Sequence, residues 1–153
     1  MDTSDFVVNQ EAVHQAIRIM ERVVKRKDRF NMAYWQSLPN STTKGEDSFC
    51  ETETEAHSCG MAACFGGWVA MSPEWKVLGG KVDGSGGPLL VKANSRYFGA
   101  DAIAVWLNIP TWKSNLLTCT GCDTLSRSGF YDGKRITDIT ATDVIGKLKA
   151  MLI

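Results

Sequence analysis

The sequence predicts a mainly α fold, an α+β arrangement in which helices dominate and a minor β-hairpin accompanies them. Two observations support this class. Apolar residues recur at helical spacing in several separate segments, and one glycine-rich stretch lies between two short apolar pieces. The 153 residues, 44% of them hydrophobic, suit a single compact helical domain over residues 1–153.

The first predicted helix begins after Asn9, a favourable N-cap residue, with Val8 and Val13 placed for a hydrophobic staple. Its apolar stripe continues through the spaced residues Val13, Ile17, Met20 and Val24. Basic residues crowd its C-terminal end, where cations suit the helix dipole. We interpret them mainly as a solvated helix end, with anion binding as the alternative.

An acidic segment and a second helix follow. Residues 40–57 are polar and acidic, which predicts a surface loop rather than a carboxylate metal site. From about Gly60 to Met71, apolar residues at helical spacing predict a buried helix that ends before Pro73. Gly66 and Gly67 cost a helix interior about 1 kcal/mol each relative to alanine, so we expect close packing to offset them.

The middle of the chain predicts a hairpin. The pieces Trp75–Leu78 and Pro88–Val91 flank the glycine-rich loop 79–87, which lacks the sequence of a Walker loop. Ser95 is then placed to cap a third helix with Phe98, Ala102, Val105 and Trp106 on its apolar face.

Two more helices complete the prediction, a short one around Trp112–Leu117 and a C-terminal one starting at Thr140. Asp143 stands at the N3 position of the latter, which favours a capping box. Among the tryptophans, Trp68 and Trp106 are expected in the core. Those that flank loops are the better pocket candidates: Trp35, Trp75 and Trp112.

Composition excludes several classes of function. With 17 basic and 17 acidic residues the net charge is zero, which argues against general nucleic-acid binding. No apolar run is long enough to span a membrane, and the acidic N-terminal sequence lacks signal-peptide character, so we expect a cytoplasmic protein. An odd count of five cysteines in that compartment indicates thiols or metal ligands rather than a disulfide framework.

The segment from His57 to Trp68 resembles a motif of small, uncharacterised bacterial and phage proteins: Cys-Gly-Thr, two small residues, Cys, then Ile-Ala-Gly-Trp. Those proteins often carry an upstream Phe-Asn-Met-x-x-Trp, matched here by Phe30, Asn31, Met32 and Trp35. This chain departs from the pattern at Met61, where Thr is usual, and at Gly66, where Ala is usual. The resemblance implies a shared fold and a bacterial or phage origin, with no settled activity.

Cys59 is predicted at the N-terminal end of the second helix, where free backbone N–H groups favour an anion. A ligand site there would use Cys59, Gly60 and Met61, with Trp35 as a stacking wall and Asn31 nearby. Its countercharge would come from Arg96 or from the cations at 25–27. Two alternatives remain open: Cys59 as a nucleophile with His57 as its base, and Cys59 and Cys64 as small buried residues of a helix contact.

A zinc site is the remaining hypothesis. Its weak candidate ligands are His57, Cys59, Cys64, Cys119 and Cys122. Because the spacing is poor, we expect no stoichiometric zinc and no other cofactor.

Together these observations predict a small phage-type accessory protein that acts by binding rather than catalysis. It would interfere with a host factor, an immune factor among the candidates, in the host cytosol. It would do so either by docking on a host protein or by sequestering a small anionic ligand such as a nucleotide. The alternatives are a cysteine-dependent enzyme that uses Cys59 with His57, and a zinc-stabilised structural module.

Overall fold

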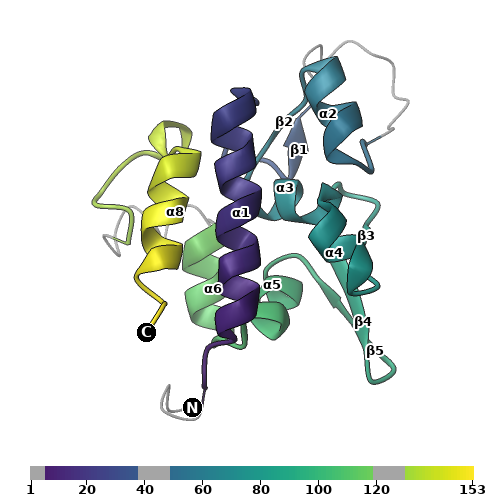
Figure 1. Cartoon of the computed structure of the whole chain (residues 1–153), viewed down its shortest axis with the longest axis vertical. Helices are drawn as coiled ribbons and strands as arrows, with labels where there is room; N and C mark the ends of the chain where they lie inside the picture. Colours follow the sequence, from purple (N-terminus) through teal and green to yellow (C-terminus); the bar gives the residue numbers. More distant parts are fainter. Residues whose placement is uncertain (1–5, 38–48, 119–129) are drawn as a thin grey trace.

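Figure 1 shows the computed structural model, which describes residues 6–37, 49–118 and 130–153. Among these residues it is an α+β structure, 51% helical and 13% strand, with two small sheets. The helices are α1 (Gln10–Arg26), α2 (Glu53–Cys59), α3 (Phe65–Met71), α4 (Pro73–Val77), α5 (Ala100–Leu107), α6 (Thr111–Thr118) and α8 (Ala141–Lys149), with a 3₁₀ turn at Ile136–Asp138. The strands are β1 (Gln36–Ser37), β2 (Ala62–Ala63), β3 (Lys81–Val82), β4 (Pro88–Lys92) and β5 (Ser95–Phe98).

The first and last helices form as predicted and lie side by side (Figure 1). The Asn9 side chain accepts a hydrogen bond from the Ala12 N–H, so Asn9 is the N-cap of α1. Thr140 and Asp143 form the predicted capping box at the start of α8. Short α6 also confirms the helix expected around Trp112–Leu117.

The predicted helix from Gly60 to Met71 is confirmed only over α3, which ends at Met71; its first half is wrong, because the chain there forms a turn and a strand. Gly60 has φ +73° and its N–H points back to α2 carbonyls, which ends α2 at Cys59. Ala62–Ala63 pairs antiparallel with β1. The predicted acidic loop is also partly wrong, because its second half contains α2, capped by Thr52. Residues 40–48 of that loop lie outside the described residues.

The middle of the chain corrects two further predictions. Pro73–Val77 is a helix rather than a strand, because Ser72 caps it and Pro73 occupies its first turn. Ser95–Phe98 is a strand rather than a helix N-terminus, and it pairs with β4 in a three-stranded sheet of order β3-β4-β5. Ala93 and Asn94 both have positive φ, as the tight hairpin between β4 and β5 requires.

The core lies between α1, α3, α5 and α8. Trp68 and Trp106 are buried in it, as predicted. Trp75 is wholly buried as well, so its assignment to a pocket wall is wrong. Its ring meets that of Trp106 edge-on, with centroids 5.4 Å apart. In the described part of the chain, no helix is long and apolar enough to cross a membrane.

Candidate ligand-binding site

The structure removes the basis for an anion site at Cys59. Cys59 is the last residue of α2, where carbonyl oxygens rather than N–H groups are left free. Gly60 caps that end, and its carbonyl accepts a hydrogen bond from Arg29 Nη1 at 3.2 Å. Met61 is buried and therefore presents no surface to a ligand.

Cys64, rather than Cys59, precedes the helix that carries the Gly-Gly-Trp sequence. It is the N-cap of the seven-residue α3 and is buried. Burial raises the pKa of its thiol to about 12, even though the N–H groups of Gly67 and Gly66 favour the thiolate. Cys64 is therefore a protonated core residue, in agreement with the structural alternative for this side chain.

Trp35 packs in a slot made of glycines. A Cβ at Gly66 would clash with the Trp35 ring, and a Cβ at Gly67 would clash with the Trp35 carbonyl. At Gly87 and Gly99 a Cβ would lie 3.0 Å from ring atoms. Close packing thus explains the two glycines of α3, as predicted, and it commits the ring faces of Trp35 to the fold rather than to a ligand.

Two segments carry the sequence motif described above, residues 30–35 and residues 57–68, and they are adjacent in space. The Asn31 N–H donates to the Ala63 carbonyl at 3.0 Å, and the Cys64 N–H donates to the Tyr34 carbonyl at 3.0 Å. The Asn31 side chain accepts a hydrogen bond from the Ala33 N–H and so shapes its own turn. Arg96 is exposed in the β4–β5 hairpin, at the opposite end of the molecule from α2 (Figure 1).

His57 does not activate Cys59. Its Nδ1 lies 2.5 Å from Oδ1 of Asp28, whose side chain is buried, whereas the thiol of Cys59 donates to the Ala56 carbonyl. Residues two apart on a helix point to different sides, which explains the separation of His57 from Cys59. Among the described residues, no group of three His, Cys, Asp or Glu side chains is placed to hold a metal. Cys119 and Cys122 lie outside the described residues.

Asp28 also belongs to a network of charges that sequence reasoning missed. Arg22 forms two-pronged ion pairs with Glu53 and Glu74, and Arg26 bridges Glu53 and Asp28. The hydrogen bond to Glu74 is the main cause that raises the pKa of Arg22. The spacing of Arg18, Arg22 and Arg26 along one helix face is the signal that could have revealed it. This network joins α1 to α2 and α4.

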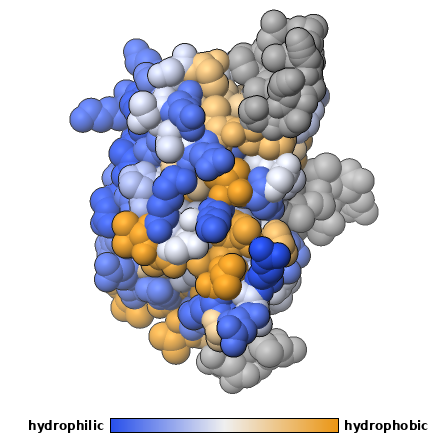
Figure 2. All heavy atoms as spheres, turned by 90° about the vertical axis from the view of Figure 1, so that its right-hand side faces the viewer, coloured by the Kyte–Doolittle hydropathy of each residue, from blue (hydrophilic) through white to orange (hydrophobic). Residues whose placement is uncertain are grey.

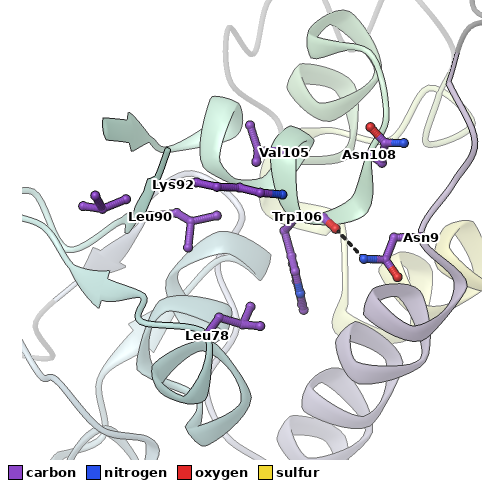
Figure 3. A pocket seen from close by; sticks show the side chains of 8 residues that line it. Asn9, Leu78, Leu90, Lys92, Val105, Trp106 and Asn108 are labelled. Carbon is purple, nitrogen blue, oxygen red and sulfur yellow. Dashed lines mark hydrogen bonds between the residues drawn. The ribbon is translucent and has the colours of Figure 1, made fainter. Parts of the chain in front are cut away.

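A hollow of about 510 Å³ lies on another part of the surface, between α5, β4 and the start of α1 (Figure 3). Its lining residues are Asn9, Leu78, Leu90, Val91, Lys92, Val105, Trp106 and Asn108. Leu90 and Trp106 are buried and form its floor, whereas Leu78 and Val91 are exposed at its rim. Figure 2 shows the face that carries α4 and the sheet, where apolar patches alternate with hydrophilic groups. The hollow, which we call the Lys92 pocket, has the size of a small-molecule site.

Among the described residues that line this pocket, Lys92 is the only charged one. In Figure 3 its side chain reaches across the hollow towards α5. No carboxylate among the described residues forms an ion pair with it. The amides opposite are engaged: Asn9 Nδ2 donates to the Trp106 carbonyl at 3.3 Å, and Asn108 Nδ2 donates to the Val7 carbonyl at 2.8 Å.

The side chain of Trp106 contains one unsatisfied polar atom. Its buried Nε1 has no hydrogen-bond partner within the described part of the chain. The buried indoles of Trp68 and Trp75, by contrast, donate to the carbonyls of Arg29 and Lys81. A buried donor without an acceptor costs stability, which makes Trp106 an exception among these three side chains.

A second hollow of about 440 Å³ adjoins the Lys92 pocket and shares Lys92, Val105 and Asn108 with it. Tyr97 and Asp101 line its other side. Lys92 therefore stands between two hollows and is accessible from both. Sequence reasoning missed this region, because β4 and α5 meet only through tertiary packing and Lys92 belongs to no motif.

Trp112 is half exposed at the far end of this surface, beside Phe6 and Lys113. It is thus the one loop-flanking tryptophan among Trp35, Trp75 and Trp112 whose ring is largely open to solvent.

The comparisons with family models, curated proteins and solved structures found no match for this chain.

Proposed function

We propose that the protein acts by binding, and that the Lys92 pocket takes a small amphiphilic anion. One observation carries the proposal: a hollow with both apolar and polar side chains in its lining, across which Lys92 reaches without an ion-pair partner among the described residues. Ligand sites combine apolar walls with a few placed polar groups in this way.

The walls and the charge define the class of ligand. An apolar or aromatic ring would lie on Leu90, Val105 and the Trp106 side chain, where it removes apolar area from water. A carboxylate, sulfonate or phosphate would pair with the Lys92 ammonium.

This proposal favours one of the two modes left open by the sequence, sequestration of a small anion, and moves it away from Cys59. In a small bacterial or phage protein, sequestration would serve an accessory role by withholding a ligand from a host factor. Docking on a host protein is the competing mode.

The test uses 1-anilinonaphthalene-8-sulfonate, a fluorescent aromatic anion, as the probe. We expect saturable binding to the folded protein, and an affinity about tenfold lower in Lys92→Ala, which corresponds to about 1.4 kcal/mol. Lys76→Ala, on the exposed side of α4 and outside the pocket, is the matched control and should bind like the parent. The same aromatic compound without its sulfonate is uncharged, and it should bind Lys92→Ala and the unsubstituted protein with equal affinity.

A second variant separates the pocket from the charge. Val105→Trp fills the hollow, so it should abolish binding of both probes while circular dichroism reports an intact fold. Equal probe affinity in the parent, Lys92→Ala and Val105→Trp would refute the pocket.

Native mass spectrometry of the purified protein then searches for the natural ligand, and thermal shifts with mono-, di- and cyclic nucleotides test that class. A ligand at 100 times its Kd should stabilise the fold by about 2.7 kcal/mol.

A further inference from the structure

Two thiols meet on the surface away from the Lys92 pocket. The Sγ atoms of Cys50 and Cys59 are 3.6 Å apart. Cys59 is exposed and Cys50 is half-buried. A disulfide bond is about 2.0 Å long, so rotation of the two side chains would close the remaining gap.

The backbone of Cys50 is held in place by Gln36. The Cys50 N–H donates to Gln36 Oε1, and Gln36 Nε2 donates to the Cys50 carbonyl, both at 2.8 Å. Gln36 is itself buried, and its Nε2 also contacts the Gly86 carbonyl at 3.3 Å. Cys50 is therefore fixed to β1 and to the β3–β4 turn, while Cys59 is fixed at the end of α2. Two thiols on separately anchored segments remain close without a bond between them.

From this geometry we propose that Cys50 and Cys59 are a dithiol site that reacts with small-molecule disulfides and forms a reversible bond across α2. The Cys59 thiolate attacks one sulfur of the small disulfide. This step forms a mixed disulfide and releases one small thiolate. The Cys50 sulfur, after losing its proton, attacks Cys59 Sγ and releases the second small thiolate. The protein loses two electrons and two protons, and the small disulfide is reduced to two thiols.

The two cysteines have different roles in this reaction, because Cys59 is exposed and Cys50 is half-buried. Cys59 is accessible to a reagent in solution, so it is the attacking residue. Burial, followed by the hydrogen bond and charge of Cys59, raises the pKa of Cys50 to about 12. Cys50 is thus protonated until the mixed disulfide forms. Once Cys59 is in that disulfide, its contribution to the pKa of Cys50 disappears, which favours the second step.

The bond would tie the residues that precede α2 to the last residue of the same helix. Neither cysteine lines the Lys92 pocket, so this inference stands independently of the proposed function. It also does not use His57, whose imidazole is held by Asp28.

The experiment uses the full chain with Cys119→Ser and Cys122→Ser, so that those two thiols cannot contribute. The protein is equilibrated in buffers of oxidised and reduced glutathione with a chelator, quenched with acid, alkylated and mapped by mass spectrometry. We expect a Cys50–Cys59 cross-linked peptide that increases with the oxidised fraction and disappears on reduction. Buried Cys64 serves as the internal control and should be alkylated only after unfolding.

Single substitutions test the two steps separately. Cys50→Ser should trap glutathione on Cys59 and raise that mixed disulfide about tenfold or more over the parent, because no second thiol resolves it. Cys59→Ser should leave Cys50 a thiol. Serine keeps the Cys50 backbone groups that Gln36 binds, and circular dichroism checks the fold. The proposal is overturned if both cysteines stay thiols at every glutathione ratio, or if Cys50→Ser accumulates no more mixed disulfide than the parent.

Discussion

Gly67→Ala is the sharpest test of the Trp35 slot. In an open helix this change would stabilise by up to about 1 kcal/mol, because alanine has the higher helix propensity. At Gly67, however, the new Cβ would fall well inside contact distance of the Trp35 carbonyl and 2.9 Å from Ala63 Cβ. A backbone atom cannot turn away as a side chain does. We therefore expect overpacking to exceed the propensity gain and to leave a net loss of about 2 kcal/mol.

Gly146→Ala is the matched control, because it makes the same change in α8 where nothing lies within 4 Å of the new Cβ. It should stabilise by about 0.5–1 kcal/mol, so the two variants should differ by about 3 kcal/mol with opposite signs. Urea denaturation followed by circular dichroism measures both free energies of unfolding. If Gly67→Ala is as stable as the parent or more stable, Trp35 does not occupy the slot and the account of these glycines fails.

Three further predictions concern acid stability, helix capping and thiol reactivity. Burial pushes the pKa of Glu74 up, but the hydrogen bond from Arg22, a backbone hydrogen bond and the charges of Arg22 and Arg18 together outweigh it and hold the pKa below the ordinary 4.5. The stability that the Arg22–Glu74 pair supplies is present at neutral pH and is lost as the pH falls below about 4.5 through the folded-state pKa. The urea midpoint of Glu74→Gln should therefore change less between neutral and acidic pH than the urea midpoint of the parent protein. Thr140→Ala removes the cap of α8 and should cost about 1 kcal/mol in the same assay, whereas an unchanged midpoint would show that the capping box contributes nothing. Iodoacetamide should label Cys59 in the native state and spare Cys64, whose burial raises its pKa to about 12; equal labelling rates would contradict that burial.

Some helix caps and apolar helix faces, which depend only on neighbouring residues in the sequence, were predicted correctly. The caps at Asn9 and Thr140 place α1 and α8, because an N-cap depends on residues within one turn. Trp68 and Trp106 could be assigned to the core because they lie on apolar helical faces. These features need no knowledge of the rest of the chain.

Other features depend on partners distant in sequence. Apolar spacing continues from Met61 into α3, and it cannot distinguish the strand Ala62–Ala63 from one more helical turn; pairing with β1 decides that. The acidic sequence of α2 lacks an apolar stripe, because its buried side includes Glu53, which pairs with the arginines of α1. The Lys92 pocket could not be predicted for the same reason, since β4 and α5 create it together.

The slot around Trp35 has a consequence for the order of folding. Its glycines come from α3, from the residue before β4 and from the residue before α5, so the ring gains its contacts only after those segments have assembled. Closing such long loops early costs chain entropy that few contacts repay. We therefore expect Trp35 to insert into its slot after the rate-limiting step of folding. Trp35→Leu should then increase the unfolding rate and leave the refolding rate almost unchanged. Stopped-flow measurements would contradict this order if refolding slowed in proportion to the lost stability, and in that case the tryptophan would be part of the folding nucleus.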